Sequence, residues 1–147
     1  MNLFDLWYAD LMHGEYVYIR YFENIVGILK NMPPESCSMT GHCIGQFVVE
    51  ADGSVYPCGF YVFEQYKSGN FVTDSFEEIQ TKIKDNILIR QSLEIADECK
   101  SCEWEFACRG GCRRDRDNGK DLECNYYCYA YKSFFTYTMD RFIKLAR

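Results

Sequence analysis

The sequence predicts an α+β domain in which a small β-hairpin and several helices are organised around centres that cysteines could hold. Three observations predict this class: an alternating segment with an Asp-Gly turn, stretches with apolar residues at helical spacing, and nine cysteines among 147 residues. The hydrophobic content of 48% suits one buried core. Because no repeat or clear linker divides the chain, we expect one domain with an N-terminal extension.

Residues 1–36 are expected to form a helical connector, and 37–147 the domain itself. Two apolar stripes recur at helical spacing in the connector, the first ending at Gly14 and the second before Pro33-Pro34. The stripes comprise Leu3, Leu6, Trp7 and Leu11, and then Phe22, Ile25, Val26 and Leu29. Neither stripe repeats a titratable or metal-binding residue, so we interpret both as core.

A β-hairpin is expected next, with strands over Gln46–Glu50 and Ser54–Pro57. Asp52-Gly53 supplies the positive φ that tight hairpin turns require. Antiparallel strands joined by a short turn place their outer ends side by side, so this hairpin would carry Cys43 and Cys58 to one place.

Helices are expected in the second half of the chain. Ser75-Phe-Glu-Glu78 resembles a capping box that opens a helix, and another helix is expected from Asn86 toward Ala96. The backbone from Cys99 to Cys112 is expected to be irregular. The longest helix should run from Tyr126 to about Ala146, where seven residues share helical spacing: Tyr127, Ala130, Tyr131, Phe134, Phe135, Thr138 and Phe142.

The net charge of −6 argues against two classes of partner. Binding to nucleic acid or to anionic lipid requires an excess of lysine and arginine, which this chain lacks. The first residues lack the basic start and apolar run of a signal peptide, so we expect none, and no run of apolar residues is long enough for a membrane span. We therefore expect a cytoplasmic protein that binds neither nucleic acid nor membrane.

Seven of the nine cysteines fall in one ordered pattern, and an eighth lies six residues upstream. An odd count and a reducing compartment favour metal binding over disulfides. Eight thiolates satisfy two [4Fe–4S] clusters, in which each iron takes one protein ligand. Two Zn²⁺ sites with four cysteines each would also use eight. The candidate ligands are Cys37, Cys43, Cys58, Cys99, Cys102, Cys108, Cys112 and Cys128.

Spacing does not fix how these eight cysteines divide into two sets. The simple division keeps the run from Cys99 to Cys112 together. A crossed division sends Cys112 to the other set and takes Cys128 in its place, as the fourth cysteine of a run does in two-cluster ferredoxins. The crossed division would couple metal binding strongly to folding, because it pins distant segments together.

At this point the chain resembles a known family. The cysteine pattern, with Val-Tyr-Pro-Cys at 55–58, Cys-Arg-Gly-Gly-Cys at 108–112 and Asn-Tyr-Tyr-Cys at 125–128, is similar to the SPASM domain of radical S-adenosylmethionine (SAM) enzymes. Among these it is most similar to anaerobic sulfatase-maturating enzymes. The resemblance covers essentially the whole chain, and residues 1–36 resemble the end of the catalytic barrel.

The resemblance implies two auxiliary [4Fe–4S] clusters and an electron-transfer role. One set would be Cys37, Cys43, Cys58 and Cys112, and the other Cys99, Cys102, Cys108 and Cys128. Four thiolates leave no open iron, so such clusters would accept the electron released as a peptide cysteine or serine becomes formylglycine. The implied partners are a radical SAM barrel, in cis or in trans, and a peptide or protein substrate. The rival function is a non-enzymatic zinc module for peptide or protein binding.

Two departures from the family pattern bear on activity. The radical-initiating motif C-x3-C-x2-C is absent, because Asp115 stands where Cys108-x3-Cys112 would need a third cysteine. This chain alone should therefore not cleave SAM. The sulfatase-maturating pattern also carries an aspartate after the third ligand, a candidate proton acceptor, and Gly59 stands there instead.

Further residues near the cysteines carry alternatives that the sequence leaves open. Cys124 is either a buried apolar residue or a competitor of Cys128. His42 is either a loop residue or a hydrogen-bond donor to a cluster. The arginines of this region either offset cluster charge or form a solvated face with Asp115 and Asp117. They are Arg109, Arg113, Arg114 and Arg116.

Overall fold

The computed structural model describes residues 1–117 and 124–147. In these ranges the α-helices are α1 (Asn2–Met12), α2 (Arg20–Leu29), α3 (Phe76–Lys84), α4 (Ile87–Ser92), α5 (Asp97–Lys100), α6 (Glu105–Cys108) and α7 (Cys128–Ala146). The strands are β1 (Val48–Val49), β2 (Ser54–Tyr56) and β3 (Gly69–Asn70). Single 3-10 turns lie at Cys37–Met39, Glu64–Tyr66 and Arg113–Asp115. None of the described helices is long and apolar enough to cross a lipid bilayer.

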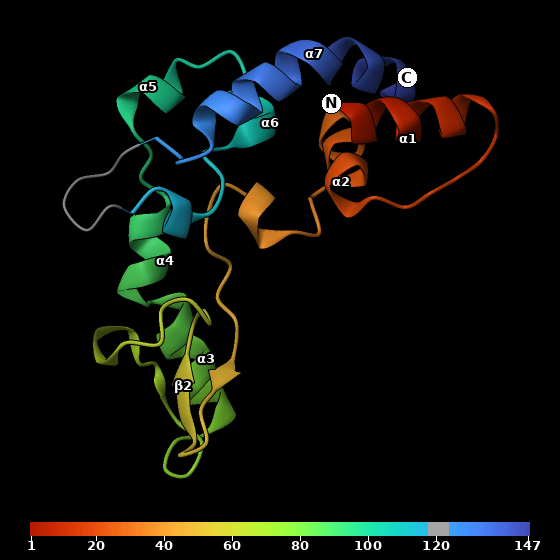
Figure 1. Cartoon of the computed structure of the whole chain (residues 1–147). Coiled ribbons are helices and arrows are strands. Elements are labelled where there is room, and N and C mark those ends of the chain that lie inside the picture. Colours follow the sequence, from red (N-terminus) through yellow and green to blue (C-terminus); the bar gives the residue numbers. More distant parts are fainter. Residues whose placement is uncertain (118–123) are drawn as a thin grey trace.

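The main core lies between the N-terminal helices and α7. The predicted long C-terminal helix is confirmed, and α7 packs against α2 at one end of the molecule (Figure 1). Aromatic rings from distant segments meet here, because the apolar stripes of these helices face one another. The buried rings are Phe4, Trp7, Phe22, Phe135 and Phe142.

Only part of the first predicted stripe is buried. Trp7 is 2% exposed, but Leu3 and Leu6 are 60% and 65% exposed. Phe4 is buried beside Trp7 in place of these leucines, because α1 turns the face that carries Phe4 and Trp7 toward the core.

An ion pair joins α1 to α7, since Arg141 Nη1 lies 2.6 Å from Asp5 Oδ1.

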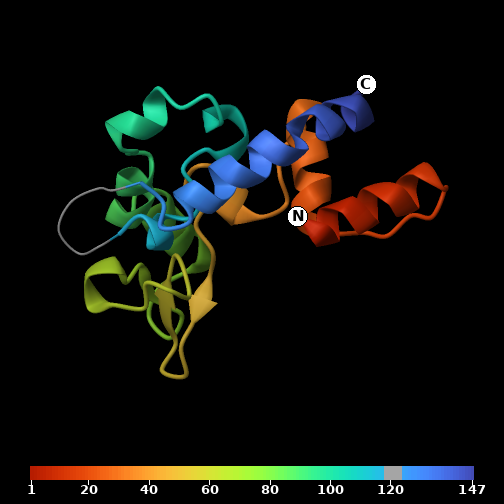
Figure 2. The ribbon, with the colours of Figure 1, turned by 45° about the horizontal axis from the view of Figure 1, so that its top comes forward.

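The predicted hairpin is confirmed, and it extends away from α7 in both views (Figures 1 and 2). Strands β1 and β2 pair antiparallel, with Val49 opposite Val55, and Gly53 adopts a φ of 84° in the turn. A third strand, β3, pairs with β2 and was not expected from the sequence. A strand of two residues is too short to show the alternation of apolar and polar side chains that predicts a strand.

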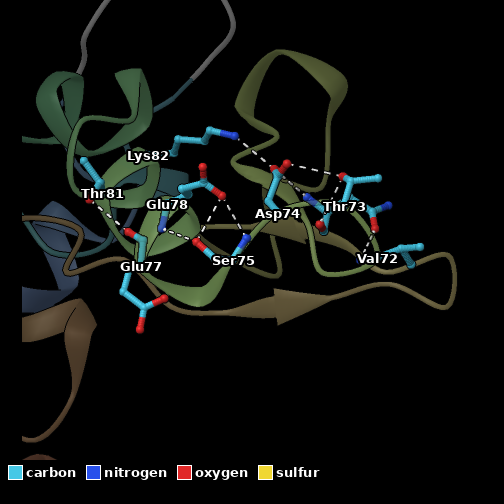
Figure 3. A network of polar contacts seen from close by, with 9 residues as sticks. Val72, Thr73, Asp74, Ser75, Glu77, Glu78, Thr81 and Lys82 are labelled. Carbon is cyan, nitrogen blue, oxygen red and sulfur yellow. Dashed lines mark hydrogen bonds and ion pairs between the residues drawn. The ribbon is translucent and has the colours of Figure 1, made fainter.

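Helix α3 covers this sheet and begins as predicted. The Ser75 side chain accepts a hydrogen bond from the Glu78 backbone, and the Glu78 carboxylate accepts one from the Ser75 backbone (Figure 3). Ile79 and Ile83 of α3 form a small core with Val55, which is fully buried. The helix therefore fixes the hairpin against the rest of the domain.

Two expectations about backbone were wrong in part. Helix α4 ends at Ser92, short of Ala96, because the Arg116 guanidinium binds the carbonyl oxygens of Ser92 and Glu94, at 3.0 and 2.6 Å. The stretch from Cys99 to Cys112 is not wholly irregular, since α5 and α6 each form one helical turn. Single turns are too short to show helical periodicity in a sequence.

Candidate metal centre

The structure gathers the eight candidate cysteines around two separate cavities. Cys37, Cys43, Cys58 and Cys112 line one of them, called here the hairpin cavity. Cys99, Cys102, Cys108 and Cys128 line the other, called here the helical cavity. This grouping matches the crossed division, which spacing alone left open.

The hairpin cavity has a volume of about 360 Å³ and lies at the end of the hairpin opposite its turn. The Gln46 amide donates to the Pro57 carbonyl at 2.8 Å, which holds the strand ends together and brings Cys43 and Cys58 to the same side. The Cys43 amide donates to Ser92 Oγ at 2.8 Å, which fastens this end to α4. His42, Gly59, Tyr61 and Arg113 also line the cavity.

The helical cavity is formed where α5, α6 and the first turn of α7 meet. It is narrow, about 20 Å³, because Trp104, Tyr131 and Cys124 line it together with the four candidate cysteines. Cys99 lies in α5, Cys102 follows it, Cys108 ends α6 and Cys128 begins α7. The cysteine run of α5 and α6 and the distant start of α7 thus converge on one cavity.

The Gly110-Gly111 pair separates the two cavities, Gly110 lining the helical one and Gly111 the hairpin one. Both glycines adopt positive φ, 76° and 67°. A Cβ on Gly111 would collide with the Asn125 amide. Asn125 is buried and donates to the Gly110 carbonyl at 3.2 Å. The backbone can pass between the cavities because glycine needs no room for a side chain.

Burial makes three of the candidate thiols reluctant to ionise in the protein alone. It raises the pKa of Cys108 to about 11, and it also raises the pKa of Cys43 and of Cys112. Backbone amides oppose this effect, since Gly110 donates to Cys108 and Arg114 to Cys112. Several thiolates crowded into one buried site need a positive charge among them, and bound metal supplies it.

The donor set fits iron–sulfur clusters, because at least four cysteines line each cavity and a cubane takes four thiolates. Among residues 1–117 and 124–147, no three Cys, His, Asp or Glu side chains lie close enough to hold one metal ion. A tetrahedral zinc site requires thiolates about 3.8 Å apart, given Zn–S bonds of about 2.3 Å. A cubane instead spreads four thiolates over four irons.

Sequence reasoning missed some residues that build the site. Ser92 is fully buried and supports Cys43, but a serine inside a helical pattern gave no signal. Asn125 was noted only as part of a motif. Its side chain also accepts from the Tyr127 amide at 2.8 Å and so shapes the entry into α7. Cys124 was not missed, since the sequence left it open as a competitor of Cys128; it lies in the helical cavity as a fifth cysteine, with its sulfur 3.6 Å from that of Cys99.

A small sheet and short helical turns that carry four cysteines to each of two cavities define a cysteine-rich metal-binding domain. The comparison with protein families makes this specific. The family model for SPASM, described as an iron–sulfur cluster-binding domain, matches residues 28–103, and the chain belongs to this family.

Curated relatives match over nearly the whole chain. The chain is 46% identical over 147 residues to the cysteine-type anaerobic sulfatase-maturating enzyme of Clostridium perfringens strain 13, covering 99% of this chain and 40% of the relative. It is 30% identical over 138 residues to the serine-type anaerobic sulfatase-maturating enzyme of Bacteroides thetaiotaomicron, covering 91% of this chain and 33% of the relative. The chain thus spans well under half the length of these relatives.

A solved structure shows the same fold. The structure titled "Native anSMEcpe with bound AdoMet and Cp18Cys peptide" matches with a TM-score of 0.89 and 46% identity, covering 99% of this chain and 41% of that one. The predicted mixed fold, with its small antiparallel sheet and long C-terminal helix, is therefore confirmed.

Proposed function

We propose that this chain is the auxiliary-cluster domain of a radical SAM peptide or protein maturase, and that it holds two [4Fe–4S] clusters. The observation that carries the proposal is the convergence of four cysteines on each of two cavities. Membership of the iron–sulfur SPASM family supports it. The domain proper would begin at residue 37, after a helical connector over 1–36.

The proposed ligands of the first cluster are Cys37, Cys43, Cys58 and Cys112, which line the hairpin cavity. Those of the second are Cys99, Cys102, Cys108 and Cys128, which line the helical cavity. When bound, clusters with four thiolate ligands supply electron acceptance without an open iron for substrate. The protein contributes partial burial and backbone amides that donate to the sulfurs of Cys108 and Cys112.

The proposed partner is a radical SAM barrel, in cis or in trans, because this chain lacks C-x3-C-x2-C. The similarity to sulfatase-maturating enzymes of both types favours formylglycine formation on a peptide cysteine or serine. Reduced thiols and oxygen-sensitive clusters would suit the cytoplasm.

Gly59 bears on which residue could accept the substrate proton in that reaction. It lines the hairpin cavity where the family pattern has an aspartate, and glycine cannot accept a proton. A Cβ built on Gly59 meets no heavy atom within 4 Å, so the backbone leaves room for a larger side chain. The proton acceptor in this protein would therefore come from another residue or from the barrel.

Anaerobic iron and sulfide analysis of the whole chain tests the proposal. We expect brown protein with about eight irons and about eight sulfides per chain. Colourless, fully folded protein containing about two zinc ions per chain would support the rival zinc module instead. Aerobic purification followed by anaerobic reconstitution provides a second preparation, and it should reach the same iron content.

A further inference from the structure

Two arginines of one short segment, the buried Arg116 and the half-buried Arg113, have side-chain nitrogen atoms without a hydrogen-bond partner. Arg116 is 2% exposed, and its Nε atom has no hydrogen-bond partner. Arg113 lines the hairpin cavity, and its Nε and Nη1 atoms are buried without partners. Unsatisfied buried guanidinium groups are costly, so each needs an explanation.

Within the described ranges, both arginines donate hydrogen bonds to neutral oxygens. Arg116 donates to the carbonyl oxygens of Ser92 and Glu94, and Arg113 donates to the Gln91 side-chain oxygen, at 3.1 Å. Carbonyl and amide dipoles do not neutralise a buried positive charge, so a counter-charge should lie close by.

The cavities provide the place for that counter-charge. The Arg116 side chain packs within 3.6 Å of the Cβ position of Gly110, which lines the helical cavity. Ser92, which binds Arg116 through its carbonyl, also binds the Cys43 amide through its hydroxyl and so connects Arg116 to the hairpin cavity. Burial lowers the pKa of Arg116, and the thiols of Cys43, Cys112 and Cys99, from both groups, act in the opposite direction.

We propose that Arg116 and Arg113 are the buried counter-cations of the two clusters and set their reduction potentials. This inference rests on the proposed function. Arg116 serves both clusters, because it packs against Gly110 of the helical cavity and is connected through Ser92 to Cys43 of the hairpin cavity. Arg113, which lines the hairpin cavity, serves the cluster there. An all-cysteine cubane in its oxidised state carries roughly −2, and reduction adds one more negative charge. A fixed positive charge favours that reduction in a medium that screens poorly.

Arg114 provides a matched control. It belongs to the same 3-10 turn as Arg113, but its side chain is exposed and lies over the Phe60 ring at 4.2 Å. Arg114→Gln removes the same charge from a position where solvent and salt screen it. A change in net charge alone would shift the reduction potentials equally in Arg114→Gln, Arg113→Gln and Arg116→Gln.

The experiment is an anaerobic redox titration of the whole reconstituted chain, followed by electron paramagnetic resonance. We expect Arg116→Gln to make both clusters harder to reduce, by roughly tenfold in the reduction equilibrium, or about 59 mV for a one-electron couple. Arg113→Gln should shift one cluster more than the other, Arg116→Lys should restore most of the shift, and Arg114→Gln should leave both potentials unchanged.

The outcomes separate this inference from the proposed function. Potentials in Arg116→Gln and Arg113→Gln equal to those in Arg114→Gln would overturn the inference while leaving the cluster assignment intact. Loss of iron with an unchanged potential in the remaining clusters would also overturn it, because it would show a purely structural role. If Arg116→Gln fails to fold, the reduction potentials of Arg113→Gln decide the question, because Arg113 is only half-buried. A wild-type chain without iron and sulfide would instead overturn the proposed function, and the inference with it.

Discussion

The sulfur atoms of Cys99 and Cys124 lie 3.6 Å apart, although 25 positions separate them in the sequence. The Cys124 thiol also lies 3.4 Å from Glu98 Oε2, to which it donates. Cys124 therefore contacts a candidate ligand and an acidic side chain, a position that suits a hydrogen-bonding neighbour of the cluster better than a ligand.

Substitutions of Cys124 and Cys128 should show which of the two cysteines is a cluster ligand. We expect Cys124→Ser to keep about eight irons per chain, because serine can make the same hydrogen bonds. Cys128→Ser should lose the cluster of the helical cavity and retain about four irons. Iron analysis after anaerobic reconstitution measures both. The reverse result would make Cys124 the ligand.

Cys112→Ala should remove one cluster and leave the other in place. Because Cys112 lines the hairpin cavity, its loss should remove that cluster and leave the one held by Cys99, Cys102, Cys108 and Cys128 spectroscopically near normal. Electron paramagnetic resonance of the reduced variant, compared with wild type, measures this. Selective loss of the other cluster would contradict the proposed ligand sets.

Gly59→Asp should be tolerated by the fold. Since a Cβ at this position meets nothing within 4 Å, we expect the free energy of unfolding to change by less than about 0.5 kcal/mol. Gly111→Asp is the contrasting variant, because its side chain would collide with Asn125 and its φ is positive. Urea titration of both variants measures this difference. A large destabilisation by Gly59→Asp would mean that the cavity wall is closed there.

Acid should weaken the connection between α1 and α7. Hydrogen bonding to Arg141 holds the pKa of Asp5 below its ordinary value of 3.8. A carboxylate with a lowered pKa in the folded state adds stability above its unfolded pKa, and that stability is lost as the pH falls through the folded pKa. We therefore expect Asp5→Asn to be less stable than wild type at pH 7.

Thermal melts at pH 7 and at about pH 3 check this prediction, since Asp5→Asn and wild type should converge as the carboxyl is protonated. Asp10→Asn, on the same helix, serves as the control. A constant difference between Asp5→Asn and wild type at both pH values would contradict the prediction.

Ser75→Ala should destabilise the sheet region through α3. Loss of an N-cap side chain costs about 1 kcal/mol, because the Glu78 amide loses its partner (Figure 3). Chemical denaturation of the cluster-loaded chain measures the change. Ser75→Asp, which keeps a cap acceptor, should be close to wild type. Equal losses in both variants would show that capping is not the cause.

Much of the local structure could be predicted from the sequence, because neighbouring residues determine it. The Asp52-Gly53 turn, the capping box at Ser75 and the aromatic spacing of α7 each act within a few positions of the chain. The cysteine pattern likewise indicated metal binding, since thiolate chemistry depends on residue type and spacing.

Only the tertiary structure decided which distant residues meet. It grouped Cys112 with the hairpin cysteines and Cys128 with Cys99, and it buried Arg116 while leaving Arg114 exposed. No local pattern distinguishes these arginines, because burial depends on which helices pack over the segment. The composition and order of residues thus determined the chemistry available, and long-range packing determined where each charge and each sulfur lies.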